Sequence, residues 1–293
     1  MATQASSTVW FITGCSSGIG RELALAALER GDKVIATARN VDKLDELRQH
    51  GAHTIALDVT WTDEAVQKVV ADAIEHCGGI DILVNNAGYS LVGATDQCSE
   101  KEIFDEFNTN VFGVYKMLRA VLPYMRKQKS GVIANIGSIV GWRAFPATGV
   151  YCTTKFAVAG LSESLRAEVA HLNIDVTCID LGAFRTSFGN NRVQAKQSTE
   201  DAGPAVEQMK KRLDAMSGKQ PGDPVKAAKV LVEVLTKTGR CAGRTLPTRL
   251  AVGSDAAPFI YNVLEKGRRE LDEWVDITSG TDHEDAANSP RLA

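Results

Sequence analysis

Residues 9–20 read Val-Trp-Phe-Ile-Thr-Gly-Cys-Ser-Ser-Gly-Ile-Gly, an apolar run that passes directly into a glycine-rich turn. The run predicts a strand over residues 9–13 that is covered on both faces of a parallel sheet. Apolar residues then recur at helical spacing over 17–30, and Gly31 supplies a stop signal. The stretch therefore predicts a strand, a tight turn and a helix, which is how a βαβ unit begins.

The same alternation continues along the chain. We expect further strands at 33–38, 53–58, 82–85, 132–136, 175–180 and 249–252. We expect further helices at 41–50, 62–77, 101–127, 151–171, 224–238 and 258–276. Strands that alternate with helices of this length form right-handed crossovers. The sequence therefore predicts an α/β fold with a doubly wound parallel sheet of the Rossmann type.

Three segments depart from this alternation. Residues 187–223 are rich in Asn, Gln, Ser, Lys and Gly, so we expect a mobile substrate-loop insertion over the site. Residues 1–8 and 279–293 are polar, and we expect both ends to be disordered. With no linker or repeat between them, residues 9–278 are expected to form a single domain with a C-terminal helical extension.

Composition excludes several classes of function. The 293 residues include 33 Lys and Arg against 36 Asp and Glu, a net charge of -3, which argues against a nucleic-acid or anionic-membrane partner. The six cysteines lack C-x-x-C spacing and are typical of reduced intracellular thiols, and the five histidines form no zinc motif, so we expect no metal. Without a leader or a long apolar run, a cytoplasmic protein is expected.

The glycines of the first turn suit a nucleotide. Gly14, Gly18 and Gly20 permit a tight turn and the close approach of a pyrophosphate, whose charge is favoured by the N–H groups at a helix N-terminus. The spacing is G-x-x-x-G-x-G, unlike the commoner G-x-G-x-x-G. An ordinary glycine-rich loop is the alternative interpretation, and the strand before and the helix after the turn argue against it.

The end of the second strand bears on the choice of dinucleotide. Chains that bind NAD usually place a carboxylate here, but the run is Ala36-Thr37-Ala38-Arg39-Asn40. Arg39 is suited to a bidentate contact with a 2′-phosphate, and Ser17 can add a hydroxyl, so NADP is expected over NAD. Asp58 is a candidate for the adenine amino group; alternatively, it caps the helix that starts near Thr62.

Tyr151 and Lys155 stand four residues apart in Tyr-Cys-Thr-Thr-Lys. On a helix the two side chains share one face, so an ammonium group lies beside a phenol. A nearby cation favours the phenolate and is expected to lower the pKa of Tyr151. The phenol is then a candidate general acid or base. The neighbouring Cys152 is expected to be a packing residue.

These motifs occur together in an order that resembles the short-chain dehydrogenase/reductase family. The resemblance covers residues 9 to about 186. It rests on Thr13-Gly14 to Gly20, on Asn85-Asn86-Ala87-Gly88, and on a serine that precedes Tyr151 by twelve intervening residues. The catalytic residues that it implies are Asn110, Ser138, Tyr151 and Lys155. The expected cofactor-binding positions, from the residues and the resemblance together, are Gly14, Ser16, Ser17, Gly18, Ile19, Gly20, Arg39, Asp58, Val59, Asn86, Ala87, Gly88, Tyr151, Lys155, Gly182, Phe184 and Thr186.

The resemblance also implies a role for each catalytic residue. Tyr151 would deliver the proton while Ser138 stabilises the substrate oxygen, Lys155 would bind the nicotinamide ribose, and Asn110 would hold a water that links Lys155 to solvent. The family's usual proline is replaced by Leu181, which puts in doubt how rigidly the loop 181–186 is held.

The expected activity is NADP-dependent hydride transfer to or from a carbonyl or secondary alcohol. A fairly bulky apolar substrate, steroid-like, retinoid-like or polyketide-like, is expected from candidate pocket walls at Leu91, Val92, Ile139, Val140, Trp142, Phe145 and Phe188, each of which is equally plausible as core. The alternatives are a non-redox lyase, isomerase or cyclase, and a dinucleotide-sensing binding protein. Because helices 101–127 and 151–171 form subunit contacts in the family, a homo-dimer or homo-tetramer is expected, unless the charged helix 265–274 covers that surface.

Overall fold

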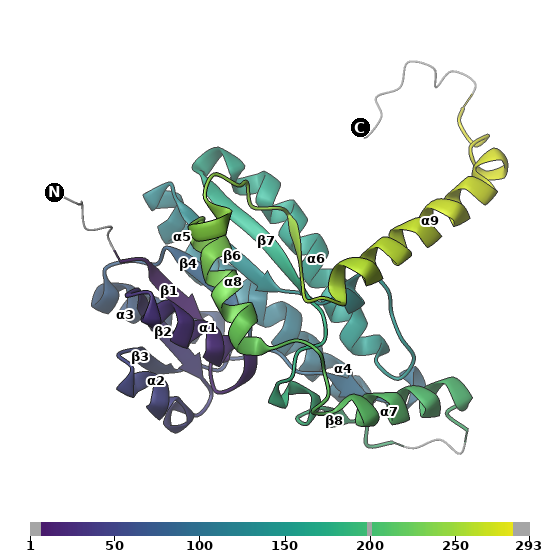
Figure 1. Cartoon of the computed structure of the whole chain (residues 1–293), viewed down its shortest axis with the longest axis horizontal. Coiled ribbons are helices and arrows are strands. Elements are labelled where there is room, and N and C mark those ends of the chain that lie inside the picture. Colours follow the sequence, from purple (N-terminus) through teal and green to yellow (C-terminus); the bar gives the residue numbers. More distant parts are fainter. Residues whose placement is uncertain (1–6, 198–200, 284–293) are drawn as a thin grey trace.

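The computed structural model describes residues 7–197 and 201–283. Its main sheet has seven parallel strands in the order β3-β2-β1-β4-β6-β7-β9 (Figure 1). Their bounds are β1 Val9–Ile12, β2 Lys33–Ala38, β3 His53–Ala56, β4 Ile82–Asn85, β6 Gly131–Ile136, β7 Ile174–Leu181 and β9 Arg249–Val252. The chain winds outwards from β1 in one direction and then from β4 in the other, which confirms the doubly wound sheet.

The helices alternate with these strands as the sequence predicts. Their bounds are α1 Gly18–Glu29, α2 Asp45–Gln49, α3 Asp63–Cys77, α4 Glu100–Phe107, α5 Gly113–Gln128, α6 Gly149–Val169, α7 Pro204–Met216, α8 Pro224–Thr236 and α9 Ala256–Thr278. Residues 41–50, expected as one helix, begin instead with a 3₁₀ turn over Val41–Leu44. The stretch 101–127 is interrupted between α4 and α5 by a π-helical turn over Asn108–Phe112.

Two apolar layers hold the helices to the sheet. Alternate residues of β1 serve both layers, since Phe11 belongs to one buried cluster while Trp10 and Ile12 belong to the other. The Phe11 cluster includes buried residues of α3, α5 and α6, and the Trp10 cluster includes buried residues of α1, α2 and α8. Both faces of the sheet are therefore covered, as its continuous apolar strands predict.

The insertion 187–223 contains regular structure that the polar sequence did not indicate. A short strand β8 (Val193–Gln194) pairs with β5 (Leu91–Val92) outside the main sheet, and α7 follows. No residue of α7 is buried, and its apolar positions Val206, Met209, Leu213 and Met216 follow helical spacing that the sequence analysis did not use. The Lys196 amide donates to Glu102 Oε1 at 3.0 Å, which adds a second attachment to the body.

The two chain ends were expected to be disordered. Residues 1–6 and 284–293 lie outside the described residues. Ser7 and Thr8 lead into β1, and Ser279–His283 are exposed beyond α9. α9 projects away from the body of the molecule (Figure 1), and so does not cover α4, α5 and α6 of its own chain.

A chain of buried amides joins the centre of the sheet to α6. Asn85 Nδ2 donates to Asn135 Oδ1 across neighbouring strands at 2.8 Å, and Asn135 Nδ2 donates to Ser162 Oγ at 2.9 Å. All three side chains are buried. Each hydrogen bond replaces water that cannot enter, so loss of the middle member leaves Asn85 Nδ2 without its partner and removes the donor to Ser162 Oγ, which still donates to the Val158 carbonyl at 2.7 Å.

Substitution of the middle residue, Asn135, should therefore lower the stability of the protein more than substitution of Ser162. We predict that Asn135→Ala lowers the free energy of unfolding by about 2–4 kcal/mol, because two buried hydrogen bonds are lost and Asn85 Nδ2 is left without a partner. Ser162→Ala, which leaves the Asn85–Asn135 bond intact, should cost about 1–2 kcal/mol. Urea unfolding of the two variants measures both values, and equal losses would contradict the proposed importance of the middle amide.

Candidate active site

The glycine-rich turn sits between β1 and α1, where the strand order reverses. Gly14 and Gly18 have φ of 73° and 61°, values that favour glycine. A Cβ on Gly20 would lie 2.3 Å from Asn86 Nδ2. Asn86 Nδ2 donates to the carbonyl oxygens of Thr13 and Gly14 at 2.8 and 3.0 Å. The glycines therefore leave room for the Asn86 side chain. This is a second reason for glycine here, in addition to the close approach of a phosphate that the sequence suggests.

The start of α1 retains groups that suit a dinucleotide pyrophosphate. Ser17 is the N-cap residue, and its side chain makes no capping hydrogen bond. Ser16 and Ser17 are exposed, while Ile19 is buried against the sheet and supports the turn. First-turn N–H groups and an uncommitted hydroxyl are the donors that a phosphate requires, so the residues present fit the cofactor expected from the sequence.

Thr13 connects the first turn to the loop after β4. Its Oγ1 accepts hydrogen bonds from the amides of Asn86 and Ala87 at 2.9 and 3.0 Å. The loop continues to Gly88, where a Cβ would lie 3.0 Å from Asn110 Oδ1. Residues 86–88 are therefore held against both the glycine-rich turn and the turn that carries Asn110.

Arg39 and Asp58 follow β2 and β3 at the same edge of the sheet. Arg39 is exposed. Burial raises the pKa of Tyr89 to about 12, and the charge of Arg39 lowers this pKa by a smaller amount. Asp58 Oδ1 accepts from the amide and hydroxyl of Thr60 at 2.9 and 2.7 Å. The N-cap of α3 is Thr62 itself, so the alternative that Asp58 caps this helix is wrong. Val59 is buried.

Asn110 lies in the π-helical turn and binds protein groups on two sides. Its Nδ2 donates to the Tyr89 carbonyl at 2.9 Å and to Thr154 Oγ1 at 3.2 Å, and its Oδ1 accepts from the Tyr89 amide at 3.1 Å. The side chain therefore holds the loop after β4 against α6. Asn110 thus forms hydrogen bonds with backbone groups of the neighbouring loop. The sequence did not indicate these contacts, because they depend on the one additional residue that a π-helical turn contains.

Ser138, Tyr151 and Lys155 are brought together by β6 and α6. Ser138 Oγ accepts from the Val140 amide at 3.3 Å and donates to the Leu181 carbonyl at 3.4 Å, and this hydroxyl acts on the phenol of Tyr151 by lowering its pKa. Lys155 Nζ donates to the Ile136 carbonyl at 2.7 Å and lies 5.6 Å from the centroid of the Tyr151 ring. The predicted neighbourhood of phenol, hydroxyl and ammonium is therefore present in the fold.

The pKa of Tyr151 departs in the opposite direction from that expected. Part of the residue remains exposed, yet burial is the largest influence and raises the pKa of the phenol above its ordinary range. The charge of Glu106 raises the pKa further, and the Ser138 hydroxyl lowers it. Burial also lowers the pKa of Lys155 to about 8. The reason is that a site closed to water disfavours the ammonium as well as the phenolate, so the cation is less available to stabilise the anion.

Glu106 is a buried carboxyl that the sequence analysis did not identify. It is 0% exposed; Oε1 accepts from the Leu91 amide at 3.0 Å, while Oε2 finds no hydrogen-bond partner among the described residues. Burial raises its pKa to about 7. The sequence signal that could have identified Glu106 is its position four residues, or one helical turn, before Asn110.

The loop after β7 is fixed by contacts that compensate for Leu181. The Gly182 amide donates to the Val252 carbonyl at 2.9 Å, and the Ala183 amide donates to Asp255 Oδ2 at 2.9 Å. Phe184 forms a β-bridge with Gly222 at the end of the insertion. Asp255 thus supplies a restraint from the C-terminal part of the chain, beyond the region of sequence resemblance.

Thr186 and Phe188, which follow β7, lie near the start of α1 and near Tyr151, respectively. A Cβ on Gly18 would lie 3.3 Å from Thr186 Cβ, so the loop after β7 meets the start of α1. The ring of Phe188 lies 5.8 Å from that of Tyr151, measured between centroids. Phe188 is therefore the candidate wall residue with a direct contact to the expected proton donor.

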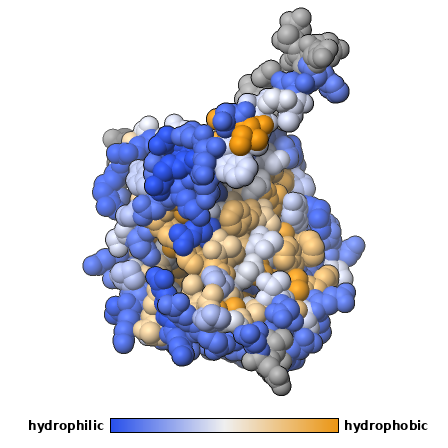
Figure 2. All heavy atoms as spheres, turned by 90° about the vertical axis from the view of Figure 1, so that its right-hand side faces the viewer, coloured by the Kyte–Doolittle hydropathy of each residue, from blue (hydrophilic) through white to orange (hydrophobic). Residues whose placement is uncertain are grey.

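The other candidate wall residues divide between site and core. Leu91 and Val92 are buried in β5, and Ile139 and Val140 are partly exposed beside Ser138. Trp142 Nε1 instead donates to Asp180 Oδ2 at 2.8 Å, with the Arg249 guanidinium 3.8 Å from its ring centroid. Phe145 packs against Phe259 of α9. The face of the molecule that bears α7 and α9 carries hydrophobic side chains in its centre (Figure 2).

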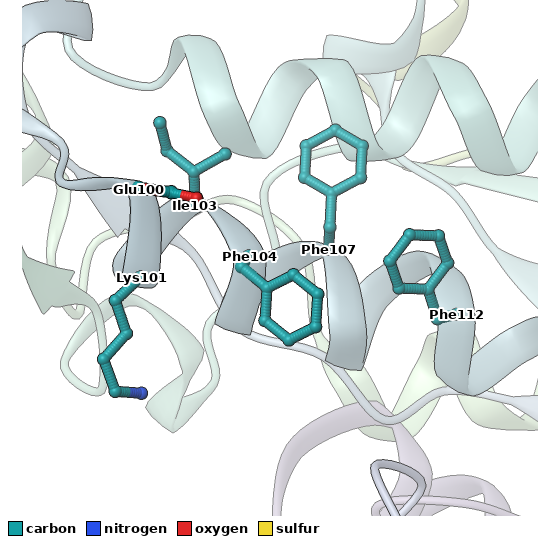
Figure 3. Close-up of a pocket in the computed structure, with 6 residues that line it drawn as sticks. All are labelled: Glu100, Lys101, Ile103, Phe104, Phe107 and Phe112. Atoms are coloured by element: carbon teal, nitrogen blue, oxygen red, sulfur yellow. The ribbon is translucent and has the colours of Figure 1, made fainter.

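A separate surface pocket of about 790 Å³ lies on α4 and the π-helical turn. Figure 3 shows its lining side chains, which are Glu100, Lys101, Ile103, Phe104, Phe107 and Phe112. It contains none of the four expected catalytic residues, so we treat it as a protein surface rather than a substrate site.

Two further classes of feature bear on the site. Among the described residues, no three His, Cys, Asp or Glu side chains are placed to hold a metal ion. In the same part of the chain, no helix has the length and apolar character needed to cross a membrane. Cys152 is buried and contacts Thr148 Oγ1 through its sulfur at 3.5 Å, as a packing residue would.

Comparison with known proteins agrees with this arrangement. Oxidoreductase BOA17 of Botryotinia fuckeliana is 33% identical over 274 residues, which cover 92% of this chain and 97% of the relative. Human retinol dehydrogenase 8 is 31% identical over 243 residues, covering 78% of this chain and 77% of the relative.

Solved structures give the same result. A short-chain dehydrogenase from Streptomyces avermitilis has a TM-score of 0.85 and 39% identity, covering 94% of this chain and 100% of the other. Serine dehydrogenase in complex with NADP+ (TM-score 0.71, 27% identity) covers 84% of this chain and 94% of its own. A 3-ketoacyl-(acyl-carrier-protein) reductase from Brucella melitensis in complex with NADH (0.68, 25%) covers 84% and 96%.

The family model described as short chain dehydrogenase matches residues 8–197, the part of the chain that carries the glycine-rich turn, Asn110, Ser138, Tyr151 and Lys155. The chain therefore belongs to the short-chain dehydrogenase/reductase family of NAD(P)-dependent oxidoreductases.

Proposed function

We propose that this protein uses NADP to reduce the carbonyl group of a fairly bulky apolar substrate, or to oxidise the corresponding secondary alcohol, with Tyr151 as the general acid or base. The observation that carries the proposal is the grouping of three side chains in one place: the Ser138 hydroxyl and the Lys155 ammonium both act on the phenol of Tyr151 or lie close to it, with Lys155 Nζ 5.6 Å from the centroid of the Tyr151 ring. These groups lie at the carboxyl ends of the strands, where ligands bind in open α/β sheets.

The bound dinucleotide supplies the hydride, and the residues of this chain supply a proton and a fixed geometry. Ser138 and Tyr151 donate hydrogen bonds to the substrate oxygen, on which negative charge develops during reduction. Tyr151 then transfers its proton to that oxygen. The Ile136 carbonyl holds Lys155 in place. The ammonium group of Lys155 then gives a proton to the Tyr151 phenolate, which restores the phenol.

The raised pKa of Tyr151 favours the direction of reduction at neutral pH. A buried phenol keeps its proton until a stronger base, the developing alkoxide, appears beside it. Oxidation needs the phenolate and should therefore require a higher pH. This proposal replaces the expectation that Lys155 alone makes the phenolate available near neutral pH.

NADP is proposed over NAD because of Arg39. It is an exposed guanidinium at the end of β2, and no carboxylate occupies residues 36–40. A 2′-phosphate accepts two hydrogen bonds from such a group, whereas a ribose 2′-hydroxyl needs an acceptor. The structural relatives include complexes with NADP+ and with NADH, so Arg39 is the feature of this chain that favours NADP.

The bulky apolar substrate is proposed from Phe188 and from the insertion around it. Its ring contacts Tyr151, and it is 40% exposed, so an apolar group bound there would cover it. We propose that the insertion moves to admit substrate, while β8 stays paired with β5. Retinol dehydrogenase 8, among the relatives, is named for an apolar alcohol.

The assembly and the compartment are part of the proposal. Exposed aromatic side chains gather on α4, the π-helical turn, α5 and α6, where Phe104, Phe112, Tyr115 and Phe156 are between 42% and 56% exposed. We propose a homo-dimer or homo-tetramer that covers them. All six cysteines are free thiols, which favours a reducing compartment such as the cytoplasm.

Tyr151→Phe removes the transferable proton and keeps the ring. We predict that kcat for reduction of a bulky apolar ketone falls by about 10²–10⁴-fold, because general acid catalysis is lost. NADPH affinity, measured by fluorescence titration, should stay within about threefold. Tyr124→Phe is the matched control and should retain full activity. If Tyr151→Phe remained as active as the wild type, the proposed proton donor would be wrong.

Arg39→Ala tests the cofactor. We predict that the KM for NADPH rises about ten- to a hundredfold, since a charged hydrogen-bonding partner of the 2′-phosphate is lost. The KM for NADH should change by less than about twofold. Arg48→Ala removes another exposed arginine from the same region and should leave both constants unchanged. Equal effects on the two dinucleotides would contradict the assignment of Arg39.

Glu106→Gln tests the electrostatics of the site. Ionised Glu106 raises the pKa of Tyr151, so removal of its negative charge should lower the pKa of that phenol. We predict that the pH dependence of kcat/KM for alcohol oxidation shifts towards lower pH in the variant. Glu100→Gln, an exposed carboxyl on the same helix, serves as control. An unchanged profile, or a shift towards higher pH, would rule out the coupling.

A further inference from the structure

A buried ion pair joins β7 to β9 beside the turn that carries Ser138. The side chains of Asp180 and Arg249 are 1% and 16% exposed. Arg249 Nε donates to Asp180 Oδ2 at 2.8 Å, and Arg249 Nη2 donates to Asp180 Oδ1 at 3.0 Å. Because a guanidinium is a rigid fork, this bidentate contact fixes the orientation of both side chains. The pair is therefore a firm link between two neighbouring strands of the sheet.

The pair also holds the far end of the Ser138 turn. Ser138 is the N-cap residue of a 3₁₀ turn, and its carbonyl accepts from the Gly141 amide at 2.9 Å. Arg249 Nη2 donates to the Gly141 carbonyl at 3.3 Å. Trp142 Nε1 donates to Asp180 Oδ2 at 2.8 Å, and its ring centroid lies 3.8 Å from the Arg249 guanidinium. Both members of the pair therefore bind a turn that belongs to neither of the strands that they join.

The near end of the turn is packed against the same carboxylate. Gly137 precedes Ser138, and a Cβ on Gly137 would lie 2.7 Å from Asp180 Oδ1. At the far end, a Cβ on Gly141 would lie 3.0 Å from the Lys155 carbonyl oxygen. Close packing of this kind leaves the backbone little freedom to shift. The turn is therefore enclosed between the ion pair and the backbone of α6, the helix that carries the expected proton donor.

We propose that Asp180 and Arg249 are positioning residues: they fix the turn on the sheet and thereby set the place of the Ser138 hydroxyl in the active site. Neither is among the four expected catalytic residues, and Arg249 lies outside residues 8–197, which match the family model. The proposal rests on the proposed function, because the pair acts only through Ser138. A donor displaced by about 1 Å is enough to slow a reaction by about 10²-fold.

Two other roles for the pair lead to different results. One is a general contribution to stability, and the other is an effect of charge on Lys155. Burial lowers the pKa of Lys155 to about 8, and the charge of Asp180 is one of the smaller influences that raise it. Either role would lower the rate whether or not residue 138 carries a hydroxyl. Positioning of Ser138 matters only when that hydroxyl is present, so the two substitutions should not be additive.

Reduction of decalone, a bicyclic apolar ketone, by the full chain with NADPH tests the proposal. We expect Asp180→Asn to lower kcat about ten- to a hundredfold, with the KM for NADPH changed by less than about threefold. Ser138→Ala should lower kcat about 10²-fold, and Asp180→Asn added to it should cost less than about a further threefold. Glu233→Gln, which breaks the exposed Arg240–Glu233 pair, is the matched control and should leave kcat unchanged. If Asp180→Asn does not fold, Arg249→Lys replaces it, since it keeps both charges and loses the bidentate geometry.

The double variant separates failure of the inference from failure of the proposed function. If its loss of kcat equals the product of the two single losses, the pair does not act through Ser138 and the inference is overturned, while the role of Ser138 stands. An Asp180→Asn chain as active as the wild type would also overturn the inference alone. A Ser138→Ala chain as active as the wild type would overturn both the inference and the proposed function.

Hydrogen exchange at the Trp142 indole tests the geometry without substrate or cofactor. In nitrogen-15 NMR spectra, with the signal assigned from the Trp142→Phe spectrum, the Trp142 Nε1 proton should exchange at least about tenfold more slowly than that of Trp61, which is 41% exposed. Arg249→Met should speed this exchange, because the turn loses its contacts with the guanidinium. Exchange that is unchanged in Arg249→Met would mean that the pair does not hold the turn, and would overturn the inference.

Discussion

The hydrogen bond from Lys155 Nζ to the Ile136 carbonyl, at 2.7 Å, joins the helix that carries Tyr151 to the strand that leads to Ser138. The rest of the site depends on this contact, because α6 and β6 must keep a fixed separation for the phenol and the serine hydroxyl to meet. The hydrogen bonds from Asn85 through Asn135 to Ser162 fix the same helix to the same strand about two turns further along α6, and they extend to β4. Burial makes these contacts strong, and it also determines the charge states of the groups that they position.

Burial and charge compete in this site, and burial prevails. A spacing of four residues on a helix suffices to bring the Lys155 ammonium near the Tyr151 phenol. The burial of both groups, however, disfavours the cation as well as the phenolate anion. The consequence is a neutral phenol beside a lysine with a pKa of about 8. The buried carboxyl of Glu106 acts in the same direction on Tyr151. The site therefore stores a proton and releases it when a base develops next to it.

The doubly wound parallel sheet and most element bounds were predictable, because the strands of such a sheet are continuous apolar runs and its helices are amphipathic. The proximity of Ser138, Tyr151 and Lys155 was predictable from spacing and from resemblance. What the sequence did not reveal depends on tertiary packing: the π-helical turn that aims Asn110 at Tyr89, and the carboxyl of Asp255 that holds the loop after Leu181. The predicted direction of the Tyr151 pKa shift was wrong, because residue spacing indicates which groups are neighbours but not how deeply they are buried.

The central claim is that Tyr151 keeps its proton until the developing alkoxide takes it. The most direct measurement is a pH titration by carbon-13 NMR of protein labelled at Cζ of tyrosine, without dinucleotide, with the Tyr151 signal assigned from the Tyr151→Phe spectrum. We predict that this signal keeps the chemical shift of a phenol up to at least about pH 10, the pKa of free tyrosine. A titration midpoint between about pH 6 and pH 9 would contradict the account, because it would mean that the ammonium of Lys155 outweighs burial.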